Sequence, residues 1–212
     1  MRFLLQLLPL LPLALGATTS PCTPQEITIT PSQILFIAPN STSCANAPEL
    51  AKGECVTAAQ AAPPLSAAFT KYKVTSRAEQ AAVLALIAFE SGEFRYNRNH
   101  FPGVPGQGTR NMQSPTFNKE YAASIPALEG RFQSVKDDPA AVLDLLLEDA
   151  ENDFGSGAWF LTTQCADAVR RGLQSGTEQG WRGFIVDCVG TEANEARKGY
   201  WVSAVNALQV SE

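Results

Sequence analysis

The stretch SRAEQAAVLALIAFESG, residues 76 to 92, decides the fold expected for this chain. Ser76 followed three residues later by Glu79 is a capping-box signature, which marks the first turn of a helix. The run AAVLALIAF that follows has no polar stripe, so we expect a helix that is buried on most sides. Gly92 offers a natural end, because glycine tolerates the left-handed conformation that terminates many helices. We therefore predict a central buried helix whose last turn carries Glu90.

The rest of the chain predicts a mainly α fold. Helical patterns are present at about residues 117–136, 139–153, 156–173 and 195–209. The longest strand-like run is Ile34 to Ile37. Between Tyr96 and Gln113 the sequence is dense in Gly, Pro and Asn, which predicts a long ordered loop, and such loops are usually functional.

Three segments are expected along the chain. Residues 1–16 combine Arg2 with an apolar run and a small-residue end, which is the order of a secretory signal peptide. Residues 17–65 are rich in Thr, Ser, Pro and Ala and predict an irregular, disulfide-linked N-terminal extension. Residues 66–212 are assigned to one helical domain. No later segment supplies about 20 apolar residues, so we expect a secreted, extracellular protein.

Cysteine content agrees with an oxidising compartment. The five cysteines are Cys22, Cys44, Cys55, Cys165 and Cys188. The pairings closest in sequence are Cys44 with Cys55 and Cys165 with Cys188, although sequence alone leaves the connectivity open. A metal site is disfavoured, because no CxxC motif is present and His100 is the single histidine. The sequon Asn40-Ser41-Thr42 predicts N-glycosylation at Asn40.

Charge and motif content exclude several function classes. The formal net charge of −5 argues against nucleic acid and anionic membranes as partners, since both are normally met by a basic face. No phosphate-binding glycine motif and no GxSxG elbow are present. His100 lies in the Gly/Pro loop and is expected to have a packing or hydrogen-bonding role. We expect a monomer that needs no cofactor.

Glu90 is the candidate for acid chemistry. At the end of a helix its carboxylate faces the negative pole of the helix dipole, and apolar surroundings add desolvation, so both effects favour the protonated form. A protonated carboxyl beside a groove can donate a proton to a glycosidic oxygen. The alternative is an ordinary solvated glutamate at a helix end.

Glu90-Ser91-Gly92 with Phe94, followed by Met112-Gln113, resembles the motif of lytic transglycosylases and goose-type lysozymes. The chain is identified, through residues 76 to 125, as a eukaryotic secreted member of the lysozyme-like superfamily. The resemblance implies that Glu90 is the catalytic acid and that Met112 and Gln113 lie beside it. Arg110-Asn111 replace the family's Gly-Leu, and the later Tyr-Asn-Ala-Gly segment is missing, with Asn194 and Tyr200 the nearest substitutes.

The resulting hypothesis is a secreted glycosidase of the muramidase type. It would cleave β-1,4 bonds in an N-acetylhexosamine polymer such as the peptidoglycan of cell walls or a chitin-type glycan. The substrate-binding residues are expected to be Gln113, Asn111, Met112, Tyr96 and Tyr200. Trp181 is the candidate sugar platform, and Asp153 is expected on a solvated helix face. The alternative is a non-catalytic glycan-binding module with a lysozyme-like fold.

Overall fold

A computed structural model describes residues 28–210 of the chain, and it shows a mainly α protein. Within this range no strand forms, and isolated β-bridges link Arg98 with Gly108 and Gly108 with Gln113. The expected fold class is therefore confirmed. The predicted signal peptide and Cys22 lie outside the described residues. The α-helices are α1 (Pro31–Ile37), α2 (Ala58–Lys71), α3 (Arg77–Glu90), α4 (Pro115–Ala123), α5 (Glu129–Val135), α6 (Pro139–Leu147), α7 (Ala150–Thr163), α8 (Asp167–Gln174), α9 (Glu178–Gly183) and α10 (Glu195–Ala207).

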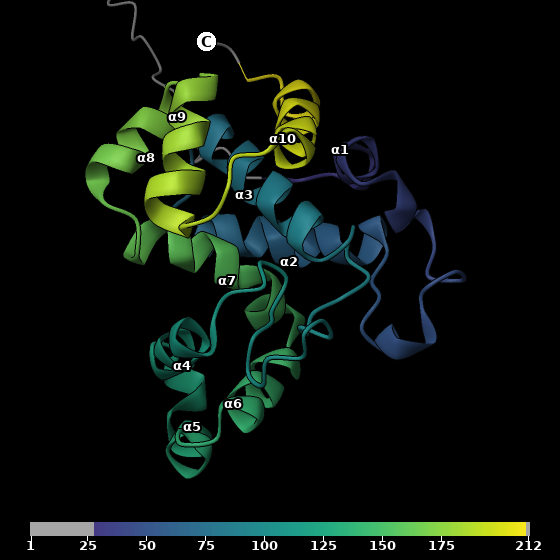
Figure 1. The fold of residues 1–212 in the computed structure, drawn as a ribbon, viewed down its shortest axis with the longest axis vertical. Helices are drawn as coiled ribbons and strands as arrows, with labels where there is room; N and C mark the ends of the chain where they lie inside the picture. Colours follow the sequence, from purple (N-terminus) through teal and green to yellow (C-terminus); the bar gives the residue numbers. More distant parts are fainter. Residues whose placement is uncertain (1–27, 211–212) are drawn as a thin grey trace, which may run out of the picture.

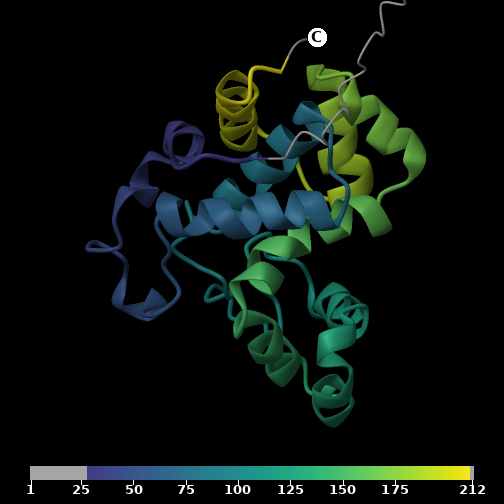
Figure 2. The same cartoon turned by 180° about the vertical axis from the view of Figure 1, so that it is seen from behind.

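The helices form two groups joined by α7. Figure 1 shows α4, α5 and α6 together at one end of the molecule, while α1, α8, α9 and α10 surround α3 at the other. The view from behind shows α2 lying across the middle, against α7 (Figure 2). Short 3₁₀-helices occur at Pro39–Thr42, Glu49–Ala51 and Pro126–Leu128, and a π-helix spans Phe184–Val189. The long loop between α3 and α4 lies where the two groups meet.

The central helix α3 matches the prediction in its bounds and its burial. Every residue from Ala78 to Ala88 is buried. Ser76 is the N-cap, but among the described residues its side chain makes no capping hydrogen bond. Glu79 is instead only 1% exposed and forms an ion pair of 2.8 Å with Arg170 on α8. A buried carboxylate needs such a partner, so Glu79 joins two helices rather than capping one.

Ser91 and Gly92 form the turn that ends α3. Gly92, Glu93 and Phe94 all have positive φ angles, of 58°, 61° and 66°. The fully buried Ser91 hydroxyl donates to the Ile87 carbonyl at 2.7 Å and accepts from the Phe94 amide at 2.8 Å. Glycine alone adopts this conformation at little cost, and the serine supplies the hydrogen bonds that the turn removes from the helix. The chain direction after Glu90 is fixed in this way.

The N-terminal extension is more regular than expected. The strand-like run Ile34 to Ile37 belongs to helix α1, which starts with Pro31 and a capping box between Thr30 and Gln33. The boundary expected between residues 65 and 66 falls inside α2. Favourable start signals for a helix therefore override the strand propensity of the isoleucines.

Three long helices expected in the second half are each divided, and the segment 156–173 breaks between Thr163 and Asp167. The segment 117–136 breaks at Ser124-Ile125-Pro126, because proline cannot continue the helix hydrogen-bond pattern. The segment 139–153 breaks before Asp149, whose side chain accepts from the Glu151 amide and caps α7. Trp159 on α7 is 4% exposed and packs in the core.

Two disulfides connect the pairs that are closest in sequence. Cys44 bonds to Cys55 and Cys165 to Cys188, as the nearest-neighbour pairing predicts. Disulfides of this kind are typical of proteins that fold in an oxidising compartment. None of the helices between residues 28 and 210 combines the length and apolar character that crossing a bilayer requires.

Candidate functional site

A cavity of about 350 Å³ lies at the end of α3, and we call it the helix cavity. Side chains from both helix groups and from the long loop meet there. Its volume falls within the range of about 300–1,000 Å³ that is usual for small-molecule sites. The lining residues are Leu86, Glu90, Gln107, Asn111, Met112, Gln113, Ser114, Phe117, Phe160, Val189, Thr191 and Arg197.

Glu90 is held in the wall of the helix cavity by Arg197 of α10. Its Oε1 accepts hydrogen bonds from Arg197 Nη2 at 2.8 Å and from Nε at 3.3 Å. The two side chains are 20% and 15% exposed, so the ion pair is largely shielded from water. The Arg197 guanidinium also lies 4.4 Å from the centre of the Phe89 ring, a cation–π distance. Glu90 is thus an oriented carboxylate with a cationic neighbour, and Oε2 receives no hydrogen bond from any described residue.

A chain of buried polar side chains includes two residues that line the helix cavity, Asn111 and Gln113. Ser156 Oγ donates to Asn111 Oδ1 at 2.7 Å, and Asn111 Nδ2 donates to Gln113 Oε1 at 3.2 Å. Gln113 Nε2 in turn donates to Asn118 Oδ1 at 2.8 Å. A side-chain amide has two N–H hydrogens, so Asn111 and Gln113 each retain one beyond these contacts. The network fixes both amides in place while leaving a donor on each.

A second cavity, which we call the loop cavity, has a volume of about 240 Å³. It is lined by Glu90, Tyr96, Arg98, Asn99, His100, Phe101, Gln107 and Met112. The structure therefore brings together five of the residues assigned to the site from sequence, and two of them, Glu90 and Met112, line both cavities. His100 has the hydrogen-bonding role expected of it, since its Nε2 lies 2.8 Å from Glu54 Oε1.

Two sequence-based assignments lie away from these cavities. The Tyr200 hydroxyl donates to Glu93 Oε1 at 2.9 Å, and burial with this contact raises the pKa of Tyr200 to about 12. Glu93 also accepts from the backbone and side-chain amides of Asn40, so it ties the N-terminal segment to α10. Trp181 is 1% exposed and stacks on Trp201 at 5.2 Å, which excludes it as an exposed platform.

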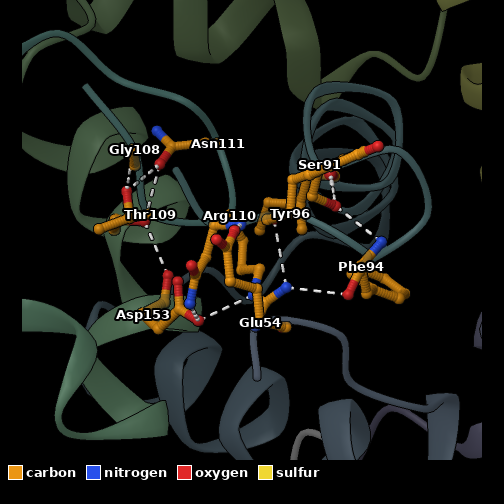
Figure 3. Close-up of polar contacts among 12 residues, drawn as sticks. Glu54, Ser91, Phe94, Tyr96, Gly108, Thr109, Arg110, Asn111 and Asp153 are labelled. Atoms are coloured by element: carbon orange, nitrogen blue, oxygen red, sulfur yellow. Dashed lines mark hydrogen bonds and ion pairs between the residues drawn. The ribbon is translucent and has the colours of Figure 1, made fainter. Parts of the chain in front are cut away.

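Arg110 and Asp153 form a buried ion pair that holds the long loop (Figure 3). Arg110 Nε donates to Asp153 Oδ2 at 2.8 Å, and its Nη atoms donate to the carbonyls of Phe94, Tyr96 and Glu54 at 2.7–3.2 Å. The expectation that Asp153 lies on a solvated helix face is wrong, because its side chain is only 5% exposed. Desolvation raises the pKa of the Asp153 carboxyl and lowers that of Arg110, against their mutual attraction. Burial disfavours the charged form of each group, so removing either partner should strongly destabilise the fold.

Glu54 connects the loop to the first disulfide. Besides His100, its carboxylate accepts from the Asn97 amide at 2.9 Å. Val56, on the other side of Cys55, donates its amide to the Phe94 carbonyl at 3.0 Å. Sequence reasoning did not single out Glu54, Arg110 or Arg197. The side-chain contacts of Glu54 with Asn97, of Arg110 with Asp153 and of Arg197 with Glu90 join residues 43 to 107 positions apart, and such separations leave no local pattern.

Comparisons with known proteins give one informative similarity. No family model matches the chain, and no solved structure matches it. A curated protein of Fusarium oxysporum (strain Fo5176), named bifunctional dioxygenase (DOX)-epoxy alcohol synthase (EAS), is 49% identical over 155 residues. The match is to a small part of an enzyme. It covers 70% of this chain and 12% of that protein.

This similarity overturns the prediction of a glycosidase. The matched protein is named for oxygenation and epoxy alcohol synthesis, so a muramidase activity and a peptidoglycan or chitin-type partner are both wrong. The geometry gives a physical reason as well. Glu90 Oε1 forms an ion pair with Arg197 at 2.8 Å, so this oxygen is engaged within the protein. The glycan-binding alternative is abandoned with the same finding.

Proposed function

We propose that this domain binds a small amphipathic molecule in the helix cavity. The ligand class that fits is an apolar chain carrying a hydroxyl group beside an ether or epoxide oxygen. The observation that carries this proposal is that one cavity is lined both by apolar side chains and by hydrogen-bonding side chains. Small-molecule sites typically combine a mostly apolar lining with a few placed polar groups.

The helix cavity has room for a short chain against its apolar side chains. Phe117 and Phe160 meet edge to face with ring centres 4.9 Å apart, and Leu86 and Val189 complete the surface. At about 30 Å³ for each water-sized group, about 350 Å³ holds roughly a dozen non-hydrogen atoms. Burial of such a chain supplies most of the binding free energy, at about 25 cal/mol for each Å² of apolar surface.

The polar side chains of the lining select the oxygen groups of the ligand. Glu90 Oε2 can accept one hydrogen bond, and the remaining N–H groups of Asn111 and Gln113 can each donate one. A hydroxyl group both donates and accepts, whereas a neighbouring ether oxygen only accepts. A hydroxyl beside an epoxide therefore uses the carboxylate and both amides, while a plain alkane leaves them without partners. Unpaired polar groups in a shielded cavity are unfavourable by about 1–3 kcal/mol each.

The matched protein supports the same ligand class, because an epoxy alcohol, the product in its printed name, carries these two oxygens. The shared segment of 155 residues has the size of one domain, whereas the name describes two activities. We therefore assign the segment a binding role beside such enzymes rather than either activity.

Calorimetric titration tests the proposal. The probe is an epoxy alcohol on a straight chain of about ten carbon atoms, with the parent alkane as ligand control. Saturable binding of the epoxy alcohol and not of the alkane is expected. Glu90→Gln should weaken binding about tenfold or more, because a charged hydrogen bond contributes about 1.5–3 kcal/mol. Tyr200→Phe, outside both cavities, should leave the affinity unchanged. Absence of saturable binding, or equal affinity of Glu90→Gln and the wild type, would refute the proposal.

We also propose that the protein is secreted and related in fold to the lysozyme-like superfamily. The N-terminal apolar run and the two disulfides support secretion. A buried helix ending in Glu90 beside Met112 and Gln113 supports the fold relationship. N-terminal sequencing of the protein from culture medium tests the first, with cleavage near Ala17 expected. Superposition of an experimental structure on members of that superfamily tests the second.

A further inference from the structure

The helix cavity and the loop cavity adjoin each other. Glu90, Gln107 and Met112 line both, so these three side chains stand between the two spaces. The loop cavity adds about 240 Å³, or room for roughly eight further non-hydrogen atoms. A ligand that enters the helix cavity at its Glu90 end therefore has a second space directly beyond the carboxylate.

Of the side chains that lie between the two cavities, Gln107 is held in place and Met112 can change its conformation. Gln107 Oε1 accepts from Asn99 Nδ2 at 2.8 Å, and Gln107 Nε2 donates to the Met112 carbonyl at 3.2 Å. These contacts hold the Gln107 amide and the Met112 backbone in place. The Met112 side chain is half-buried, and an unbranched thioether has three rotatable bonds. It can move aside without breaking any hydrogen bond described here.

The loop cavity offers uncharged hydrogen-bonding groups. The Tyr96 hydroxyl has no hydrogen-bond partner among residues 28–210, and His100 uses only Nε2, in its contact with Glu54. Arg98 is already paired with Asp144 at 2.6 Å. Phe101 stands at the rim with 79% of its surface exposed. This set suits a neutral polar end group, such as a hydroxyl, with some apolar surface beside it.

We infer that the natural ligand spans both cavities past Met112, with Tyr96 binding its far polar end. This inference rests on the proposed function. The ligand would be an oxygenated chain of about 20 non-hydrogen atoms. Its apolar end would lie against Phe117 and Phe160, its hydroxyl and epoxide oxygens at Glu90, and a second hydroxyl at Tyr96. Tyr96 is thereby a length-selecting residue.

The test compares two ligands on three proteins by calorimetry. The short ligand is the epoxy alcohol used above. The long ligand carries the same group and extends, on its hydroxyl side, by a chain of about eight atoms that ends in a hydroxyl. At the usual efficiency for each added atom, the wild type should bind the long ligand roughly tenfold to a hundredfold more tightly. Tyr96→Phe should weaken only the long ligand, by about fivefold to tenfold. Phe117→Ala should weaken both.

Each outcome decides between the two proposals. Equal affinity for the short and the long ligand overturns the inference that both cavities are used, while the proposed function stands. The inference is also overturned if Tyr96→Phe weakens both ligands equally. Such a result would show that the ring has only a structural role, which does not depend on ligand length. Failure of the wild type to bind either ligand removes the proposed function itself. Circular dichroism confirms that each variant is folded before titration.

Discussion

Replacing Asp153 by Asn should strongly destabilise the protein. The change removes the charge partner of Arg110, whose side chain is only 3% exposed. Breaking a buried ion pair from one side typically costs about 3–5 kcal/mol, because the remaining charge has neither water nor a counter-ion. The Asn amide oxygen can still accept from Arg110 Nε, so we expect the lower end, about 3 kcal/mol. That is a large share of the roughly 5–15 kcal/mol that stabilises an ordinary domain.

Arg110→Met should be at least as damaging. In addition to the ion pair, it removes the donors to the backbone carbonyls of Phe94, Tyr96 and Glu54. Each buried acceptor left without a partner costs about 1–3 kcal/mol unless water replaces the lost donor. Arg110→Met should therefore lower the free energy of unfolding at least as much as Asp153→Asn does.

Urea denaturation followed by tryptophan fluorescence, with the disulfides oxidised, measures the effect. A loss of about 3 kcal/mol corresponds to a melting temperature lower by roughly 6–12 °C for a chain of this size. Glu148→Gln is the matched control, because its ion pair with Arg131 is more than half exposed and should contribute nothing measurable. If the free energy of unfolding of Asp153→Asn lies within about 0.5 kcal/mol of the wild-type value, the ion pair does not hold the loop.

Three further predictions concern packing, pH and cross-linking. Gly180→Ala should destabilise the protein by at least 1–3 kcal/mol, because a Cβ there would collide with the backbone of α8. Gly199→Ala, in the interior of α10 with nothing within 4 Å, should instead stabilise it by about 0.5–1 kcal/mol in thermal unfolding. The raised pKa of Tyr200 gives stability that is present below pH 10 and is lost as the pH rises towards about 12. The loss in the free energy of unfolding over this pH range should be below about 1 kcal/mol, because solvent screens the group. It should be absent in Tyr200→Phe. Replacing Cys44 and Cys55 by Ser opens a loop of 11 residues and should cost roughly 3 kcal/mol in urea denaturation.

Opposite results would be informative for each prediction. A stable Gly180→Ala variant would mean that α8 and α9 can separate. If Tyr200→Phe and the wild type lose stability equally between pH 10 and 12, the contact with Glu93 is weak in solution. If the variant with Cys44 and Cys55 replaced by Ser is as stable as the wild type, the contacts of Glu54 alone hold the segment.

The sequence predicted those features of the fold that local patterns encode. The apolar run of α3 and its glycine end could be read directly, because burial on all sides leaves no polar stripe. The helix α1 was missed although Thr30, Pro31 and Gln33 form a recognisable start, since the isoleucines that follow favour a strand. The breaks at Pro126, at Asp149 and between α7 and α8 were missed because hydrophobic periodicity continues across them.

The candidate site was only partly predictable. Residues in the motifs around Glu90 and Met112 do converge on the cavities. Arg197, which orients Glu90, lies 107 residues away, and the contact depends on how α10 packs against α3. Asp153 looked like one of several acids on a polar helix face, and only the position of Arg110 shows that it is buried. The prediction of function failed for a related reason. The chemistry of a single glutamate depends on its neighbours in space, and the sequence does not show which residues these are.

The adjacency of α1 and α10 bears on how this domain combines with others. The two helices lie side by side in Figure 1, and Gln33 Nε2 donates to the Ala207 carbonyl at 3.4 Å. A longer polypeptide would therefore enter and leave the folded body at neighbouring points on one edge. Such a domain can be inserted into a host protein without stretching the host's own backbone, and its ends can be joined to make a circular permutant.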